Sequence, residues 1–204
     1  MARWLGEAAV ADGLDAGMPV DGAWIIRRAT MTVERAPRVG EELELVTWCS
    51  GVAKSVAERR TSIRAGGASI AEAEAIWVHV DPEARRPSRL PERFHEVYGE
   101  SAAGRRPRSS LRHPPAPPPT AEHLEWFFPR ADIDLAGHVN NTLYWRVAEE
   151  HLDLADATRG TALLEAEYRA GIGHGTAEVA RAGSMLWISA PDGELAATIS
   201  VEPR

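Results

Sequence analysis

Residues 132–145 read DIDLAGHVNNTLYW, a polar turn that runs into the start of an amphipathic helix. After the turn, apolar side chains recur at helical spacing, with charged side chains on the opposite side. Asn140 and Asn141 are natural N-cap residues. The spacing predicts a helix from about Asn141 to Thr158, and Gly160 is expected to end it.

Strand-like runs surround this helix, bounded by glycine, proline and aspartate. A further helix is expected at 2–16, stopped by Gly17 and Pro19. The predicted strands cover 23–33, 42–50, 56–64, 69–80, 124–130, 161–169, 175–182, 185–190 and 194–202. The order of one helix and four strands therefore occurs twice, which predicts an α+β fold of two similar units, each a helix packed on an antiparallel sheet. The first unit is expected to lack the leading strand that the second has before its helix.

Arginine and proline dominate residues 82–122, including a stretch, PPAPPP, that favours extended polyproline. We therefore expect an N-terminal unit at 1–81, a linker at 82–122 and a C-terminal unit at 123–204. The linker arginines, Arg105 and Arg106 among them, either form a surface that binds acidic partners or are simply solvated.

The bulk composition excludes several classes of protein. A net charge of −7 argues against a nucleic-acid binder, and no apolar run is long enough to span a bilayer. Glu7 stands where a signal peptide would need an apolar residue, and the single cysteine, Cys49, cannot form an internal disulfide. These features predict a cytoplasmic protein. Cys49 follows a strand-like run, so we interpret it as a packing residue, with a catalytic thiol as the alternative.

Known site patterns fit the 132–145 turn poorly. An EF-hand loop would need ligands at Ala136 and Leu143. A zinc site would need a second ligand at close spacing to His138, and no Gly-x-Ser-x-Gly motif is present. We therefore expect no metal and no cofactor.

Acyl chemistry remains. Asp134 could attack a thioester or deprotonate a water molecule, and His138 could share the base role or orient the water. Backbone N–H groups from Gly137 to Asn141 would stabilise the negative charge that develops on the carbonyl oxygen, which places Gly137, Asn140 and Asn141 in a candidate oxyanion hole. Alternatively, the asparagines only cap the helix and Asp132 only holds the turn. Glu7 is a weaker candidate, more simply interpreted as an exposed helix carboxylate.

The pattern Asp-x-Asp-x-x-Gly-His-Val-Asn-Asn-x-x-Tyr-x-x-x-x-Glu resembles the hotdog-fold thioesterases, and most of all the acyl-ACP thioesterase family, which joins two hotdog units in one chain. The first half carries further matching segments. These are WIIRR at 24–28, RVGE at 38–41, TW at 47–48, IWVHVD at 76–81 and RRPSRLP at 85–91.

The resemblance implies that the catalytic groups lie in the second unit, with Asp134 and His138 at the positions of the catalytic aspartate and histidine. Two positions depart from the family. Ala136 stands where an asparagine is usual, and Gly171 and Ile172 stand near the place of a glutamate or cysteine on the next strand. The Asp-Leu-Ala-Gly turn at 134–137 is also similar to that of hydroxybenzoyl-CoA thioesterases, which use an aspartate and helix-terminal amides.

These features predict a thioesterase of lipid metabolism that cleaves acyl-ACP or acyl-CoA, as a monomer of fused hotdogs or a homodimer. An acyl carrier protein would be a partner of complementary charge for the linker arginines. The alternatives are a non-catalytic acyl-binding or carrier-docking protein, suggested by Ala136, Gly171 and Ile172, and a dehydratase, for which a second catalytic segment is not evident.

Overall fold

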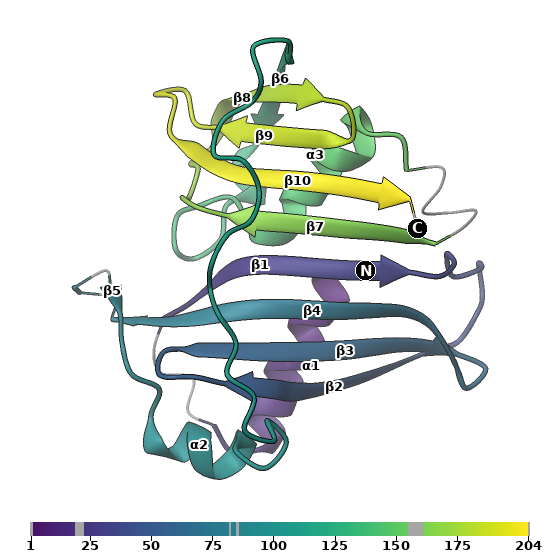
Figure 1. The fold of residues 1–204 in the computed structure, drawn as a ribbon, viewed down its shortest axis with the longest axis vertical. Coiled ribbons are helices and arrows are strands. Elements are labelled where there is room, and N and C mark those ends of the chain that lie inside the picture. The colour runs from purple at the N-terminus through teal and green to yellow at the C-terminus, as the bar shows by residue number, and fades with distance from the viewer. Residues whose placement is uncertain (1, 19–22, 82, 85, 155–160, 204) are drawn as a thin grey trace. The chain divides into compact units, whose positions relative to one another are not determined.

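A computed structural model describes residues 2–18, 23–81, 83–84, 86–154 and 161–203 (Figure 1). The chain divides into two compact units, Met1–Ser110 and Leu111–Arg204. Within the described residues, no helix combines the length and the apolar character needed to cross a membrane.

The first unit packs helix α1 (Ala2–Asp15) against an antiparallel sheet with strand order β2-β3-β4-β1. The strands are β1 (Ala23–Val33), β2 (Leu43–Val52), β3 (Val56–Ala65) and β4 (Ala68–Asp81), with a short β5 (Arg86–Pro87) paired to β4. In Figure 1, α1 lies behind this sheet. The strand limits follow those predicted to within a few residues.

A charged group fixes α1 to its sheet. The Nη2 of Arg59 on β3 lies 2.7 Å from Oδ2 of Asp12, and the hydroxyl of Tyr98 donates to the same oxygen at 3.0 Å. Asp12 faces the sheet, so its carboxylate needs these partners to offset the loss of water.

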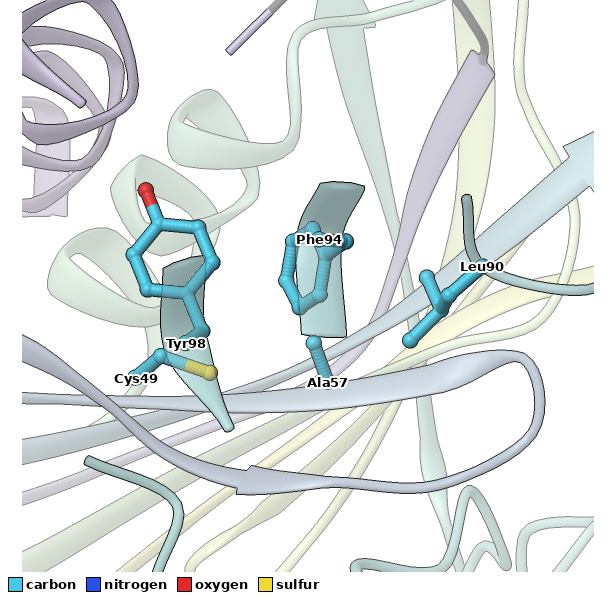
Figure 2. Packing of buried hydrophobic residues seen from close by; sticks show 5 residues of the cluster. All are labelled: Cys49, Ala57, Leu90, Phe94 and Tyr98. Carbon is cyan, nitrogen blue, oxygen red and sulfur yellow. The ribbon is translucent and has the colours of Figure 1, made fainter. Parts of the chain in front are cut away.

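The arginine- and proline-rich segment is not a plain linker over its whole length, because it contains helix α2 (Glu92–Tyr98). Pro91 precedes the first helical residue, and Gly99 follows the last. Phe94 and Tyr98, one turn apart, are buried against Cys49 and Ala57 of the sheet, and Leu90 completes the cluster (Figure 2). Burial raises the pKa of the Cys49 thiol, which agrees with a packing role for this residue.

The second unit has strand β6 (Glu122–Phe128) before its helix α3 (Tyr144–His151) and four strands after it. These are β7 (Ala162–Tyr168), β8 (Gly175–Ala182), β9 (Met185–Ser189) and β10 (Leu195–Pro203), in the antiparallel order β7-β10-β9-β8-β6. Tyr144, Val147 and Ala148 form the buried side of α3. The helix ends earlier than predicted, at His151, because Leu152 adopts extended backbone angles; Thr158 and Gly160 lie outside the described residues.

Residues 111–114, here called the strap, are hydrogen-bonded to the strands of the second unit. Backbone N–H groups of Arg112 and His113 donate to the carboxylate of Glu167, which is 0% exposed. The Nη2 of Arg169 donates to the carbonyl of His113 at 2.9 Å, and the Trp187 indole donates to the carbonyl of Pro114 at 2.9 Å. Figure 1 shows this part of the chain crossing the face of the sheet opposite α3.

The imidazole of His113 extends this network into the sheet. Its Nδ1 lies 2.9 Å from Oγ1 of Thr198, and its Nε2 lies 3.2 Å from Oγ of Ser200 and 3.3 Å from Oε1 of Glu165. Side chains alternate between the two faces of a strand, so Glu165 and Glu167 share the face that the strap covers. This face of the sheet therefore carries polar side chains that are nevertheless buried, among them Glu165, Glu167 and Thr198.

Candidate active site

Asp132 lies at the base of the loop between β6 and α3. This residue is only 7% exposed, and its Oδ2 lies 3.2 Å from Nη1 of Arg146 on α3. Its carbonyl accepts the N–H of Asn140 at 2.9 Å. Asp132 therefore connects the two ends of the loop, in agreement with the interpretation that it holds the turn.

Asp134 closes a five-residue loop with its own backbone and side chain. Its N–H donates to the carbonyl of His138 at 2.8 Å, while its Oδ1 accepts the N–H of Ala136 at 2.8 Å and that of His138 at 3.3 Å. Gly137 has a φ of 81°, in the left-handed region that favours glycine. The loop thus presents the exposed Asp134 carboxylate to solvent in a fixed orientation.

Ala136 contributes to this loop only through its backbone N–H. Its side chain is exposed. Both hydrogen bonds to the Asp134 carboxylate go to Oδ1, and among the described residues Oδ2 has no partner. One carboxylate oxygen therefore maintains the loop, while the other can accept a proton.

The helix that follows begins with an asparagine cap. Oδ1 of Asn140 accepts the N–H of Thr142 at 3.0 Å and its hydroxyl at 2.8 Å. One 3-10 turn, Asn141–Leu143, precedes α3. Tyr168 on β7 holds this turn against the sheet, because its hydroxyl donates to the carbonyl of Asn141 at 3.0 Å.

Two of the three amides expected in the oxyanion hole have acceptors within the loop. The N–H of Gly137 already donates to the carbonyl of Asp134 at 3.0 Å, and the N–H of Asn140 donates to Asp132. Neither amide is free to bind a substrate oxygen. The N–H of Asn141 opens the 3-10 turn, where intrahelical acceptors are missing, and it has no acceptor among the described residues. Asn141 is thus the remaining donor of the three.

His138 lies against Gly171, in the segment between β7 and β8. A Cβ atom on Gly171 would come within 2.5 Å of Cγ and Cδ2 of His138 and 2.8 Å of Nδ1. The next residue secures this contact, since the N–H of Val139 donates to the carbonyl of Ile172 at 2.7 Å. No hydrogen bond joins the His138 ring to the Asp134 carboxylate within the described part of the chain.

Tyr144, the tyrosine of the motif and the first residue of α3, is buried. The pKa of Tyr144 is raised to about 12, mainly by burial. The negative charge of Asp134 adds to the rise, and a hydrogen bond with the Ile172 backbone partly offsets it. Its ring packs against Phe128 and Tyr168, with ring centroids 5.5 and 5.7 Å apart. Tyr144 therefore stays a neutral phenol within the electrostatic range of Asp134.

Glu7 shows no feature of a catalytic group. It is exposed on α1, and its Oε1 lies 3.2 Å from Nε of Arg3, one turn away. This is the exposed helix carboxylate of the simpler interpretation. The described residues also contain no cluster of three or more histidine, cysteine, aspartate or glutamate side chains that could hold a metal ion.

Family comparisons cover most of the chain. Residues 18–98 match the acyl-ACP thioesterase N-terminal domain, and residues 119–179 match the acyl-ACP thioesterase C-terminal domain. A chloroplastic palmitoyl-acyl carrier protein thioesterase from Gossypium hirsutum is 28% identical over 158 residues, which are 72% of this chain and 37% of that protein. An uncharacterized protein of Mycobacterium tuberculosis is 26% identical over 155 residues, 74% of this chain and 61% of that protein. The chain thus spans less than two thirds of these relatives' own lengths.

Solved structures agree on the fold. The acyl-ACP thioesterase from Bacteroides thetaiotaomicron superposes with a TM-score of 0.78 at 17% identity, over 98% of this chain and 86% of that chain. The 12:0-ACP thioesterase from Umbellularia californica gives 0.77 at 18% identity, over 100% of this chain and 86% of that chain. The predicted fold class of two tandem hotdog units is confirmed. With its two domain matches in the expected order, the chain belongs to the acyl-ACP thioesterase family.

Proposed function

We propose that this protein hydrolyses an acyl thioester to a free acid and a thiol, with the active site at the 132–145 loop of the second unit. One observation carries the proposal. The exposed Asp134 carboxylate is locked by its own Oδ1 into a loop that leaves Oδ2 without a partner among the described residues. The loop runs directly into the start of a helix. A fixed carboxylate near the Asn141 N–H, which has no acceptor among the described residues, is suited to acyl transfer.

In this reaction Asp134 removes a proton from water as the water oxygen attacks the thioester carbonyl carbon. Direct attack by the carboxylate, with water hydrolysing the resulting anhydride, is the covalent alternative. The Asn141 N–H donates to the carbonyl oxygen as it becomes negative, and His138 in its neutral form orients the water. The carbon–sulfur bond then breaks, and the sulfur leaves as the thiol after taking up the proton.

Family membership supports an acyl group held on an acyl carrier protein, with acyl-CoA as the other carrier to be tested. Carrier proteins of this kind would have to meet the chain through complementary charge. Arg106 and Arg108 are exposed and suited to such a contact. Arg105 is engaged, since its Nη2 lies 2.7 Å from Oε1 of Glu58, and Arg85 lies outside the described residues.

The test measures free thiol released from a panel of acyl-ACP and acyl-CoA thioesters. We expect release by the unaltered protein, and loss of at least on the order of a hundredfold in Asp134→Ala. Asp192→Ala is the matched control, because Asp192 is also an exposed aspartate of the second unit whose Oδ1 accepts a backbone N–H two residues on. Background release from both the unaltered protein and Asp134→Ala would refute hydrolysis. Equal activity in these two proteins would refute the role of Asp134.

The pH profile tests the second residue. If His138 acts as the neutral imidazole, activity should rise with pH across the range in which histidine loses its proton. A flat profile between about pH 5 and 8 would contradict this role.

A second candidate function is acyl binding without hydrolysis. It is favoured by the engagement of the Gly137 and Asn140 amides within the loop, which leaves fewer donors for an oxyanion. A non-hydrolysable acyl thioether analogue distinguishes the two functions. Saturable binding of the analogue without any thiol release from the thioester panel would establish the second function in place of the first.

A further inference from the structure

We propose that Gly171 is a positioning residue, whose missing side chain creates the place where the His138 imidazole sits at the active site. The inference rests on the proposed function for the consequence in catalysis, and on the packing alone for the position of the ring. It also assigns a reason to one of the two positions at which this chain departs from its family.

The backbone does not explain a glycine at this position. Gly171 is not among the glycines with positive φ, so its backbone angles are accessible to residues with side chains. Space is the remaining constraint. An added Cβ would lie 2.5 Å from two ring atoms of His138 and 2.8 Å from a third, closer than non-bonded atoms approach.

The contact involves the body of the ring and not its tip. Cγ, Cδ2 and Nδ1 are the atoms that would collide, so the ring lies across the position where a Cβ would project. His138 is otherwise exposed. One side of the imidazole therefore rests on the protein, while the remainder faces solvent and an incoming substrate.

The backbone around this contact is fixed from both directions. The His138 carbonyl and N–H are both hydrogen-bonded to Asp134, and Val139 is bonded to Ile172, the neighbour of Gly171. Because neither chain segment can retreat easily, a larger residue at 171 must displace the ring itself. The exposed ring can rotate into solvent, so the fold should tolerate the change while the ring loses its position.

The experiment compares Gly171→Ala with Gly173→Ala. Gly173 lies two residues away, also has no positive φ, and has no atom within 4 Å of an added Cβ. Nuclear magnetic resonance of the histidine side chains gives the direct readout, with the His138 signals assigned by their absence in His138→Ala. We expect Gly171→Ala to shift the His138 ring signals and Gly173→Ala to leave them in place. Unchanged His138 signals in Gly171→Ala would overturn the inference.

A double-mutant cycle tests the consequence for catalysis. If Gly171 acts through the imidazole, Gly171→Ala should lower kcat towards the His138→Ala value and flatten the pH profile. In the His138→Ala background the same change should then have no further effect, since the ring that it displaces is gone. A loss of equal size in both backgrounds would show a merely structural role and overturn the inference.

Melting temperatures of the four proteins in the cycle show whether each is folded. In the double variant the alanine at 171 has no imidazole to collide with. Failure of the proposed function gives a different result. In that case no thiol release depends on Asp134, while the resonance shifts in Gly171→Ala still decide whether Gly171 places the ring.

Discussion

Replacing Glu167 with glutamine should destabilise the second unit strongly, although the two side chains have nearly the same shape. The Glu167 carboxylate is fully buried and receives the N–H groups of Arg112 and His113. Its Oε2 also lies 3.3 Å from Nη2 of Arg169, whose side chain is 20% exposed. An amide keeps one acceptor oxygen but turns an N–H₂ group towards a backbone N–H, and it removes the negative charge.

The magnitude follows from these contacts. Loss of one hydrogen bond to a charged acceptor costs about 1.5–3 kcal/mol. Removing one partner of a buried ion pair costs about 3–5 kcal/mol when the other charge is left alone. The Arg169 guanidinium keeps its bond to the His113 carbonyl and some contact with water, so the second cost applies only in part. We expect Glu167→Gln to lower the free energy of unfolding by about 3 kcal/mol in total.

Urea unfolding followed by tryptophan fluorescence measures this change, and one of the seven tryptophans, Trp187, is bonded to Pro114 of the strap. The matched control is Glu178→Gln, an exposed glutamate on β8, which should stay within about 0.5 kcal/mol of the unaltered protein. If Glu167→Gln also stays within about 0.5 kcal/mol, the strap does not depend on this carboxylate and the reasoning is refuted.

Three further predictions concern the first unit and the buried tyrosine. Phe94→Ala should lower the free energy of unfolding by about 3 kcal/mol, because Phe94 anchors α2 in the cluster with Cys49; an unchanged urea midpoint would mean that α2 is not packed there. The raised pKa of Tyr144 means that the folded state holds its proton more tightly, so stability is full below about pH 10 and falls as pH approaches 12. Unfolding at about pH 9 and 11.5 should therefore show a smaller loss of stability in Tyr144→Phe than in the unaltered protein, by about 2 kcal/mol, and equal losses would contradict the shift. The Arg35 hydrogen bond lowers the pKa of Glu41 to about 2, so its contribution is present above about pH 4.5 and is lost as pH falls towards 2. Thermal unfolding of Glu41→Gln should lack this part of the acid sensitivity, and identical acid profiles would argue against the ion pair in solution.

The strands could be predicted from the sequence because two local signals agree. Alternating side chains identify each strand, and glycine turns such as Gly66–Gly67, with φ of 58° and 82°, mark where it ends. The cap at Asn140 and the loop at Asp134 depend on neighbours in sequence, so their residue types point to them directly.

The missed elements depend on contacts distant in sequence. Helix α2 lies within a segment whose arginine and proline content suggests solvent, although Pro91, the pair Phe94 and Tyr98, and Gly99 are a usable start, apolar face and end. Glu165 and Glu167 alternate with apolar residues and so suggest a solvent-facing strand surface. Only the folded chain shows that the strap covers them.

The part of the candidate site that the sequence did not predict also depends on contacts between residues distant in sequence. Nothing in the order of residues indicates that the His138 ring occupies the space of a side chain at Gly171, because loop and strand end meet only in three dimensions. The engagement of the Gly137 and Asn140 amides likewise depends on how the loop closes on itself.

The strap also matters for where the second unit can be cut from the rest of the chain. A fragment starting at residue 119, where the C-terminal family match starts, would remove the N–H groups that satisfy Glu167 and the histidine that lies between Thr198, Ser200 and Glu165. In that fragment the Glu167 carboxylate, which is buried in the whole unit, would lose the partners that the strap provides. A gene fusion or transplant that keeps this half working must therefore carry the residues from 111 onward with it.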